Sequence, residues 1–417
     1  MLIQKGFKFR LKPTKKQKHL LLQHGGNTRF IWNAFLQQNI EYYKQEKKFI
    51  FFHDLANSLP ELKQEYDFLQ LSYSQSLQQV AKQFDKALKD SYKTEKGFPS
   101  FKRKMLLTDS FTIPQNWKLK QGYVVIPKIG KVKWVKHRPL QGKPKHITIS
   151  QDGNNWYCSV LCEYEVEKQE KKMDNIVGID VGLKEFAVFS DGRIIPNIKI
   201  LKKYEKQLAK AQRRLSRKQK GSKNRFKQRM KVRNIHTKIR NTRQDFLHKT
   251  SNLIAKNYDG IVLEDLNVKG MMKNHKLAKS ISDVSWSEFK RQLKYKCRWN
   301  FKHFFEIGRF TPTTKVCSEC GCIQDMPLNK RIFNCPDCGI SIDRDLNASI
   351  NIKMIGLNKI LNKSYFDTVG HTGINTCGEE GSGLNGSTIQ TKPNFVEARK
   401  RKSSQNIYSE KTEAPMF

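Results

Sequence analysis

Apolar and polar positions follow different periods along the chain, and the changes of period divide it into predicted elements. Apolar and cationic residues alternate over residues 5–11, a pattern typical of a short strand. The T-K-K-Q sequence that starts at Thr14 is a capping box, so we expect a helix to begin there. The pair Gly25 and Gly26 is expected to end this helix, and aromatic residues predict a second helix over residues 29–47.

A third predicted helix has the clearest helical spacing in the N-terminal part. Its apolar stripe comprises Leu77, Val80, Ala81, Phe84 and Leu88. Its opposite face carries Gln78, Gln79 and Lys82. We therefore interpret residues 13–95 as a helical module with a basic, glutamine-bearing face. That face would either contact nucleic acid or simply be solvated, and the pattern alone favours neither.

Residues 96–172 change to the alternating pattern of β-strands. Aromatic and cationic residues are interleaved over residues 97–104, where Lys102 and Arg103 are candidate contacts to nucleic acid. Two long alternating stretches follow, and the second contains the hairpin signal D-G-N-N. This pattern predicts a small antiparallel barrel or sheet, which the strand at 5–11 would complete.

The second half of the chain contains two buried strands separated by a long basic segment. The strands are I-V-G-I-D-V-G at residues 176–182, followed by a hairpin partner, and Y-D-G-I-V-L-E-D-L-N-V at residues 258–268. Residues 201–245 hold 18 lysines and arginines against two acidic residues. Two apolar stripes, the second running from Val232 to Leu253, predict an antiparallel helical hairpin with a cationic exterior. Its candidate phosphate contacts are Arg213, Arg214, Arg217, Arg225 and Arg229.

The charge of the chain indicates its kind of partner. Of 417 residues, 79 are Lys or Arg and 38 are Asp or Glu, which gives a formal net charge of +41. Such a chain repels itself unless a polyanion neutralises it, so nucleic acid is the favoured partner and a membrane surface the weaker alternative. The sequence has no apolar run of about 18 residues and no signal-peptide pattern, so we expect a location in the bacterial cytosol. Residues 363–417 are rich in Gly, Ser, Thr and Asn and are expected to be disordered.

Four of the nine cysteines form two C-x-x-C pairs, Cys317 with Cys320 and Cys335 with Cys338, with 14 residues between the pairs. In a reducing compartment this spacing is typical of a tetrahedral Zn²⁺ site, and four thiolates leave no open position for catalysis. We therefore expect a structural zinc ribbon. Cys322 lies close enough in sequence to compete weakly as a ligand.

Three carboxylates occupy positions where a charge is costly to bury. Asp180 lies in the buried strand V-G-I-D-V-G, Glu264 ends the buried run I-V-L-E, and Asp345 or Asp343 begins a helix predicted after the second cysteine pair. One such carboxylate could be explained by a salt bridge to the basic hairpin. Three are better explained by divalent cations, because Mg²⁺ and Mn²⁺ prefer hard oxygen ligands and two such ions can promote cleavage of a phosphodiester.

Four motifs occur in an informative order: G-I-D-V-G-L-K, I-V-L-E-D-L-N-V, the pair C-S-E-C-G and C-P-D-C-G, and D-R-D-L-N-A-S-I-N-I. In this order they resemble the RuvC-like nuclease core of the TnpB (OrfB) family, which bacterial insertion sequences encode and which is related to the type V CRISPR effectors. The N-terminal segments F-R-L-K-P-T-K-K-Q-K-H-L-L and F-P-S-F-K-R-K also resemble that family. The resemblance spans roughly residues 3–360.

The resemblance implies an RNA-guided DNA endonuclease with an α/β, RNase H-like (RuvC-like) core. That core would carry an inserted zinc ribbon and a basic helical hairpin, and a helical recognition module and a small β-barrel would precede it. By position in the family motifs, Asp180, Glu264 and Asp345 correspond to the catalytic carboxylates that hold Mg²⁺ or Mn²⁺, and Asp343 is a near neighbour. The four paired cysteines correspond to the Zn²⁺ ligands.

The same resemblance implies the partners and the domains. The partners are a guide RNA from the same element, with one protein per RNA, and double-stranded DNA with a short flanking motif, both strands of which a single site would cut in turn. The implied domains are the first strand or strands of a barrel or wedge domain (1–12), the helical module (13–95), the rest of the barrel (96–172), the nuclease core (173–310) with its hairpin (200–256), the zinc ribbon (311–340), the end of the core (341–362) and the disordered tail (363–417).

Three other functions remain open at this point. A transposase that performs strand transfer usually has its carboxylates in the order D, D, E, whereas this chain has D, E, D. A guide-directed repressor would bind DNA without cutting it, but such relatives lose acidic residues that are all present here. A basic RNA-binding structural protein would leave the carboxylates in buried strands unexplained.

Overall fold

The computed structural model describes residues 1–93, 97–104, 109–167, 173–327 and 329–360, so the tail expected to be disordered lies outside the described residues. The described chain contains three sheets, of seven, five and two strands. None of its helices combines the length and the apolar character that crossing a lipid bilayer requires.

The first strand, β1 (Leu2–Lys12), leads directly into one long helix, α1 (Lys15–Glu46). Thr14 caps this helix as predicted: its hydroxyl accepts from the N–H of Gln17 at 3.3 Å, and the Gln17 side chain accepts from the N–H of Thr14 at 3.0 Å. The predicted break at Gly25 and Gly26 is wrong, because the helix continues through both residues. A Cβ atom on Gly25 would lie 2.5 Å from the Cβ of Asp109, so this glycine permits close packing instead of ending the helix.

Four further helical segments accompany α1. They are α2 (Phe52–Asn57), α3 (Leu59–Glu65), the 3-10 helix η1 (Asp67–Leu71) and α4 (Ser74–Lys93). The predicted apolar stripe of α4 is buried in one cluster with Ile31, Trp32 and Phe35 of α1. Trp32 and Phe84 meet edge to face with ring centroids 5.2 Å apart. The N-terminal helices therefore have a hydrophobic core of their own.

β1 is an inner strand of a seven-stranded antiparallel sheet. The other strands are β2 (Ser110–Ile113), β3 (Lys118–Lys120), β4 (Tyr123–Ile126), β5 (Gly130–Val135), β6 (Lys143–Asp152) and β7 (Asn155–Glu165). The strand order β2-β6-β7-β1-β5-β4-β3 is linear, so among the described residues the pairs do not close the sheet into a ring. The D-G-N-N signal forms the turn between β6 and β7, with Gly153 at a φ of 61°.

The five-stranded sheet belongs to the second half of the chain. Its strands are β8 (Ile176–Asp180), β9 (Glu185–Phe189), β10 (Ile194–Pro196), β11 (Gly260–Glu264) and β12 (His303–Ile307). They follow the order β10-β9-β8-β11-β12, in which β8, β11 and β12 are parallel and β9 and β10 are antiparallel to their neighbours. This arrangement places the carboxyl ends of β8, β11 and β12 at the same edge.

Helices cover both faces of this sheet. On one face, α10 (Arg344–Ile360) packs its Ile352 and Ile355 against Ile176 and Val262. The other face packs against α6 (Lys223–Asn257), α8 (His275–Val284) and α9 (Trp286–Trp299), and the short helix α7 (Val268–Met271) precedes α8. Burial on both faces explains why β8 and β11 have continuous apolar sequences.

The predicted basic hairpin consists of α5 (Ile200–Ser216) and α6, with Gly221 at a φ of 83° in the turn. The prediction that Leu253 belongs to its apolar stripe is wrong, because this side chain is 56% exposed. In the last turns of α6 the buried side chains instead include Leu247, Ser251 and Ile254, which face the sheet and α9.

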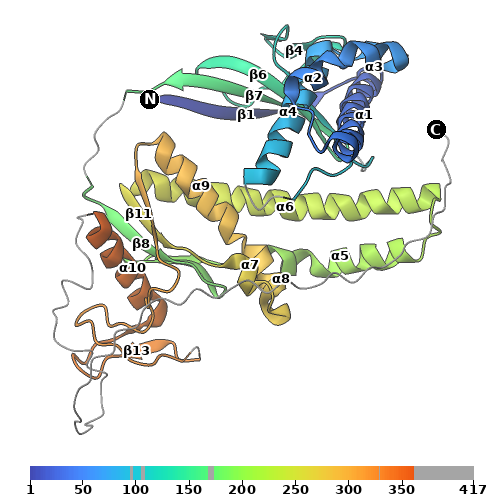
Figure 1. The fold of residues 1–417 in the computed structure, drawn as a ribbon. Coiled ribbons are helices and arrows are strands. Elements are labelled where there is room, and N and C mark those ends of the chain that lie inside the picture. Colours follow the sequence, from blue (N-terminus) through green and yellow to red (C-terminus); the bar gives the residue numbers. More distant parts are fainter. Residues whose placement is uncertain (94–96, 105–108, 168–172, 328, 361–417) are drawn as a thin grey trace.

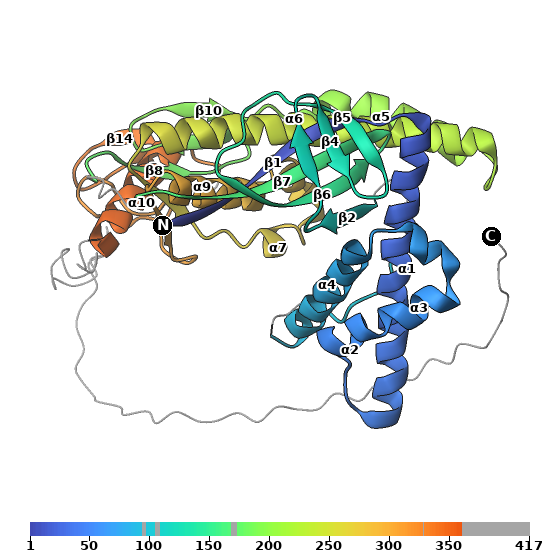
Figure 2. The same ribbon diagram turned by 90° about the horizontal axis from the view of Figure 1, so that it is seen from above.

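Two views show how these parts lie relative to one another. Helices α1–α4 lie beside the seven-stranded sheet, far from α10 and the two-stranded sheet of β13 (Ile332–Asn334) and β14 (Ser341–Asp343) (Figures 1 and 2). Helices α5 and α6 form a long hairpin, and the turn between them lies away from the five-stranded sheet (Figure 1). Near its middle, α6 joins the seven-stranded sheet through Arg233 and Arg240, which both pair with Asp152 of β6.

Candidate functional site

The first two candidate carboxylates end neighbouring parallel strands. Ile179 of β8 lies opposite Leu263 of β11, so the residues that follow, Asp180 and Glu264, are adjacent at the carboxyl edge of the sheet. Both side chains are half-buried. The carboxyl edge of an open α/β sheet is the usual place for a binding site.

The third carboxylate reaches this edge from α10. Asp345 is the second residue of α10, and the helix lies across β8 with Gly178 beneath it. The Asp345 carboxylate accepts a hydrogen bond from Nη2 of Arg344 at 3.1 Å and pairs with Nη1 of Arg331 at 3.5 Å. The sheet and one helix thus bring together three residues that are up to 165 positions apart.

Asp343 has a different role from Asp345. Its Oδ1 accepts from the backbone N–H groups of Asp345 at 2.9 Å and Leu346 at 3.1 Å. These are the contacts of a helix N-cap. The Asp343 carboxylate therefore stabilises the start of α10, whereas the Asp345 carboxylate lies near enough to Asp180 for its charge to act there.

Electrostatic interactions link Asp180 to the other two carboxylates. Burial raises the pKa of Asp180 to about 7, and the charges of Glu264 and Asp345 add to this effect against the opposing charge of Arg344. Burial also raises the pKa of Glu264, and a hydrogen bond from the Thr313 hydroxyl opposes it. Crowded acids of this kind hold protons unless a cation joins them.

The carboxylate oxygens of Asp180, Glu264 and Asp345 lie farther apart than the ligand atoms of a bound metal ion. Among the described residues, only the four paired cysteines form a group of metal-ligating side chains whose donor atoms all lie within 4.8 Å of one another. The donor set of Asp180, Glu264 and Asp345 suits a hard divalent cation, which would have to draw the oxygens closer.

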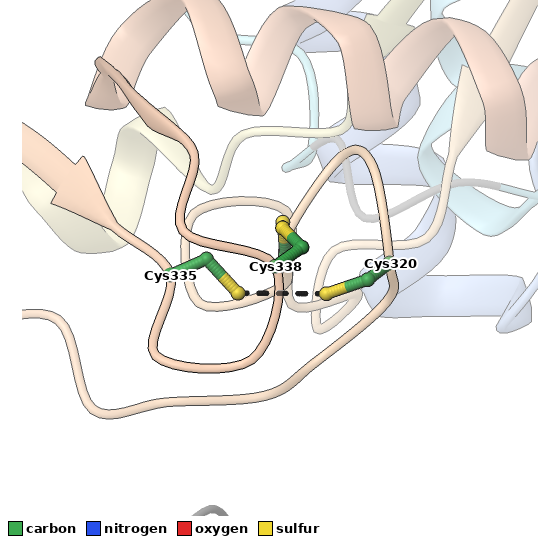
Figure 3. Close-up of side chains that lie close together, drawn as sticks. Cys320, Cys335 and Cys338 are labelled. Carbon is green, nitrogen blue, oxygen red and sulfur yellow. Dashed lines mark hydrogen bonds between the residues drawn. The ribbon is translucent and has the colours of Figure 1, made fainter.

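The four cysteines have the geometry of a closed metal site. Cys317 Sγ lies 3.6 Å from Cys338 Sγ, and Cys320 Sγ lies 3.4 Å from Cys335 Sγ. Figure 3 shows the side chains of Cys320 and Cys335 pointing toward each other from two loops, with Cys338 close to both. A tetrahedral ion with bonds of about 2.3 Å needs sulfur atoms about 3.8 Å apart, so the group fits structural Zn²⁺.

Each cysteine pair lies on a tight turn. The N–H of Gly321 donates to the carbonyl of Cys317, and the N–H of Gly339 donates to that of Cys335, both at 3.1 Å. Both glycines have a positive φ, 78° and 73°, which explains the glycine after each pair. Cys322 is not in the four-sulfur group; its carbonyl accepts from the N–H of Cys317 at 2.8 Å, and its side chain packs in the apolar core of the ribbon.

The hairpin arginines divide into two kinds. Arg213, Arg214, Arg217 and Arg229 are exposed. Arg225 instead donates through Nη1 to the carbonyls of Leu215 at 3.0 Å and Lys218 at 2.7 Å, so it closes the hairpin turn. A groove of about 510 Å³ runs between the helices, and it is lined by Arg214, Arg217, Lys218, Asn224, Lys227, Gln228 and Lys231.

The candidate contacts to nucleic acid in the N-terminal part lie on α4 and in the segment 97–104. Gln78 and Lys82 are exposed on α4, Gln79 is half-buried, and Arg103 is exposed in the segment that follows. Lys102 is held more firmly: its backbone exchanges two hydrogen bonds with the Asn33 side chain, and its Nζ lies 3.6 Å from the centre of the Trp32 ring.

Three features of the site are not evident from the sequence alone. Gly178 lies in the V-G-I-D motif, and its lack of a side chain is what admits α10. The Thr313 hydroxyl donates to Oε1 of Glu264 at 2.5 Å. Arg344, between the two candidate aspartates, moderates the local negative charge. The glycine and the arginine are visible as members of their motifs, whereas nothing in the sequence distinguishes Thr313 from Thr314.

Comparison with known proteins gives three matches to family models. Residues 159–275 match the OrfB family of IS605-type elements, described as "Probable transposase". Residues 286–352 match a Cas12f1-like TNB domain. Residues 1–48 match a helix-turn-helix domain of the same OrfB family, although here Lys15–Glu46 form one helix.

Individual relatives match over most of the chain. A protein of Streptomyces pristinaespiralis named "Putative RNA-guided DNA endonuclease" is 33% identical over 85% of this chain and 90% of its own length. InsQ of Escherichia coli K12, which bears the same description, is 33% identical over 84% of this chain and 92% of its own length. A solved Cas12f1–sgRNA–target DNA complex aligns over 84% of this chain and 99% of its own, at 17% identity and a TM-score of 0.33, which is too low to support an argument.

Proposed function

Since the chain belongs to the OrfB/TnpB family of IS605-type elements, we propose that it is an RNA-guided, metal-dependent DNA endonuclease with one RuvC-like site. The observation that carries the proposal is that Asp180 and Glu264 are adjacent at the carboxyl edge of the five-stranded sheet, with Asp345 near enough for its charge to act on Asp180. The strand order, three parallel strands with an antiparallel pair at one edge, agrees with an RNase H-like core.

In this proposal the three carboxylates hold Mg²⁺ or Mn²⁺. When bound, two such ions would stabilise the attacking and the leaving oxygen of the phosphodiester. The protein's own contribution is to hold Asp180 in a partly dry site where the charges of Glu264 and Asp345 repel its own, so that the carboxylates are poised to bind cations. Arg344 limits that repulsion, and the Asp343 cap fixes the start of the helix that presents Asp345.

The structural metal and the nucleic-acid partners follow from other parts of the chain. Cys317, Cys320, Cys335 and Cys338 would hold Zn²⁺ in the ribbon. The net charge of +41 and the exposed hairpin arginines suit a guide RNA and its DNA target. We assign residues 13–95, with 1–12 and 96–172, to the recognition of a flanking DNA motif and of the RNA, and residues 173–310 and 341–362 to the nuclease core.

The proposal can be tested with the protein and the DNA that surrounds its gene. The two are expressed together, and the RNA that co-purifies with the protein is sequenced. That RNA is then given a new guide segment and incubated, with protein and Mg²⁺, with plasmids that carry the matching target beside randomised flanking sequences. We expect one structured RNA and cleavage beside one short motif. Cleavage of no plasmid, or cleavage that ignores the guide, would contradict the proposal.

A further inference from the structure

One buried hydroxyl contacts a candidate catalytic carboxylate. The Thr313 Oγ1 donates to Oε1 of Glu264 at 2.5 Å, and the threonine is only 4% exposed. Thr313 lies in the segment that leaves β12 and reaches the first metal-binding cysteine, Cys317, four residues later. The hydrogen bond is therefore made by the chain that leads into the ribbon, and not by the sheet that carries Glu264.

Helix α10 holds this segment through two asparagines on one face. Asn351 donates through Nδ2 to the carbonyls of Thr313 at 2.8 Å and Val316 at 2.7 Å. Asn347, one turn earlier, donates to the carbonyl of Val316 at 2.7 Å and accepts from the N–H of Ser318 at 2.9 Å. Both asparagines are almost completely buried. These bonds fix the chain from Thr313 to the residue after Cys317.

The same helix carries Asp345 at its start. The asparagines thus connect three things: the helix of one candidate carboxylate, the threonine that contacts another, and the first cysteine pair. Buried amides that satisfy backbone carbonyls in this way hold a segment in one conformation, since moving it would leave those groups without partners.

We propose that Thr313 is a positioning residue for Glu264, and that the four-cysteine ribbon holds Thr313 in place, so that metal binding in the ribbon prepares the carboxylate site. This inference rests on the proposed nuclease function. Thr313 would act as a hydrogen-bond donor to a metal ligand. Its hydroxyl occupies one lone pair of the Glu264 Oε1 and orients the carboxylate, so that the remaining lone pairs can face the cation. Loss of such a partner usually costs 10–100-fold in metal affinity or activity.

The test uses three variants of the full-length protein with its guide RNA. Thr313→Val keeps the shape and removes the hydroxyl, Thr313→Ser keeps the hydroxyl, and Thr314→Val makes the same change at the half-buried neighbour. Mn²⁺ binding is measured by electron paramagnetic resonance on zinc-loaded protein, with Asp180→Ala as the blank. We expect about a 10–100-fold weaker Mn²⁺ affinity in Thr313→Val, and values near wild type for the other two. Cleavage should show a lower kcat with an unchanged KM for target DNA.

The part played by the ribbon is tested by removing its zinc. Chelation should weaken Mn²⁺ binding about as much as Thr313→Val does, and readdition of zinc should restore it. In zinc-free protein, Thr313→Val should lower the Mn²⁺ affinity little further, because the ribbon is proposed to act on the carboxylate site through Thr313. Additive losses would show that the ribbon does not act through Thr313, and would overturn that half of the proposal.

The outcomes separate this inference from the function on which it rests. If wild type cuts DNA and binds Mn²⁺, but Thr313→Val does both equally well, the positioning role is wrong and the nuclease proposal stands. If Thr313→Ser fails as badly as Thr313→Val while both retain zinc, the side chain matters for packing and the positioning role is again wrong. If wild type neither binds Mn²⁺ nor cuts, both proposals fall together.

Discussion

Gly178 and Ser349 lie in such close contact that a Cβ atom on the glycine would be 2.1 Å from the serine carbonyl oxygen. Helix α10 therefore rests directly on the backbone of β8, two residues before Asp180. A second close contact, between Gly356 and the Val262 side chain, holds the other end of the helix, where a Cβ would lie 2.4 Å from the valine methyl. The separation of Asp180 and Asp345 thus depends on glycine, which has no side chain, at both positions 178 and 356.

We expect Gly178→Ala to displace α10. Backbone atoms cannot yield as a flexible side chain can, so the variant should lose about 1–3 kcal/mol of folding free energy and most of its cleavage activity. Thermal unfolding and cleavage of matched DNA are the measurements. Gly26→Ala, inside α1, is the matched control, since its Cβ would meet only the end of Arg29 at 3.7 Å. An alanine there should be neutral or slightly stabilising.

The ribbon should bind one zinc ion per chain. Replacing Cys335 with Ser should remove the metal and unfold the ribbon locally, because binding energy in such sites is folding energy. Elemental analysis of the purified variants measures this directly. Cys322→Ser is the control and should keep full zinc, since Cys322 lies outside the four-sulfur group. A Cys335→Ser protein with a full complement of zinc would contradict the assignment.

The exposed arginines of the hairpin should bind phosphate groups. Changing Arg213, Arg214, Arg217 and Arg229 together to Gln should flatten the dependence of RNA affinity on salt, by about 0.7–0.9 in the log–log slope for each phosphate that is no longer neutralised. Arg225→Gln should act differently: it should lower thermal stability and leave the slope nearly unchanged, because Arg225 closes the turn. Binding titrations over a range of salt concentrations distinguish the two. An unchanged slope in the fourfold variant would show that this face of the hairpin does not bind RNA.

The raised pKa of Asp180 predicts a pH effect on stability in the absence of Mg²⁺. The folded chain keeps this proton up to about pH 7, whereas the unfolded chain releases it near the ordinary aspartate pKa of 3.8, so stability falls as the pH rises through this window. Asp180→Asn removes the effect. Its stability relative to wild type should therefore increase by about 2–3 kcal/mol between pH 5 and pH 8.

Denaturant titrations at the two pH values measure this difference. Asp245→Asn, on the exposed side of α6, makes the same chemical change as a control and should show no such trend. Added Mg²⁺ should reverse the advantage of Asp180→Asn at pH 8, since the ion replaces the proton on the native carboxylate. A pH-independent difference between Asp180→Asn and wild type would contradict the electrostatic account of the site.

The strands and cysteines of the site could be predicted because their signals are local. A carboxylate at the end of a continuous apolar run, or two C-x-x-C pairs with following glycines, has few other structural explanations. The predicted helix end at Gly25 was wrong because a glycine pair inside a helix has the same sequence signature as a helix end. The reason for the glycine is the close packing of Asp109, which is 84 positions away in the sequence and fills the space that a side chain at Gly25 would need. The prediction that Leu253 is buried was wrong because α6 packs against different elements along its length, and its last turns bury the face that contacts the five-stranded sheet and α9.

Thr313 could not be predicted for a related reason. The sequence T-P-T-T offers two adjacent threonines, and the choice between them depends on Asn351, 38 residues further along the chain. Asn347 and Asn351 are visible in the D-R-D-L-N-A-S-I-N-I motif, but their partners are backbone carbonyls, which leave no trace in the sequence.

The most direct test of the central claim compares four alanine variants in one cleavage assay with guide RNA, matched DNA and Mg²⁺. Asp180→Ala, Glu264→Ala and Asp345→Ala should each abolish cleavage and retain guide-dependent DNA binding, because the carboxylates supply metal ligands and base pairing supplies recognition. Asp343→Ala removes only the cap of α10 and should keep substantial cleavage. Full cleavage by the first three variants would refute the nuclease assignment, and loss of cleavage in Asp343→Ala with its retention in Asp345→Ala would show that the other aspartate is catalytic.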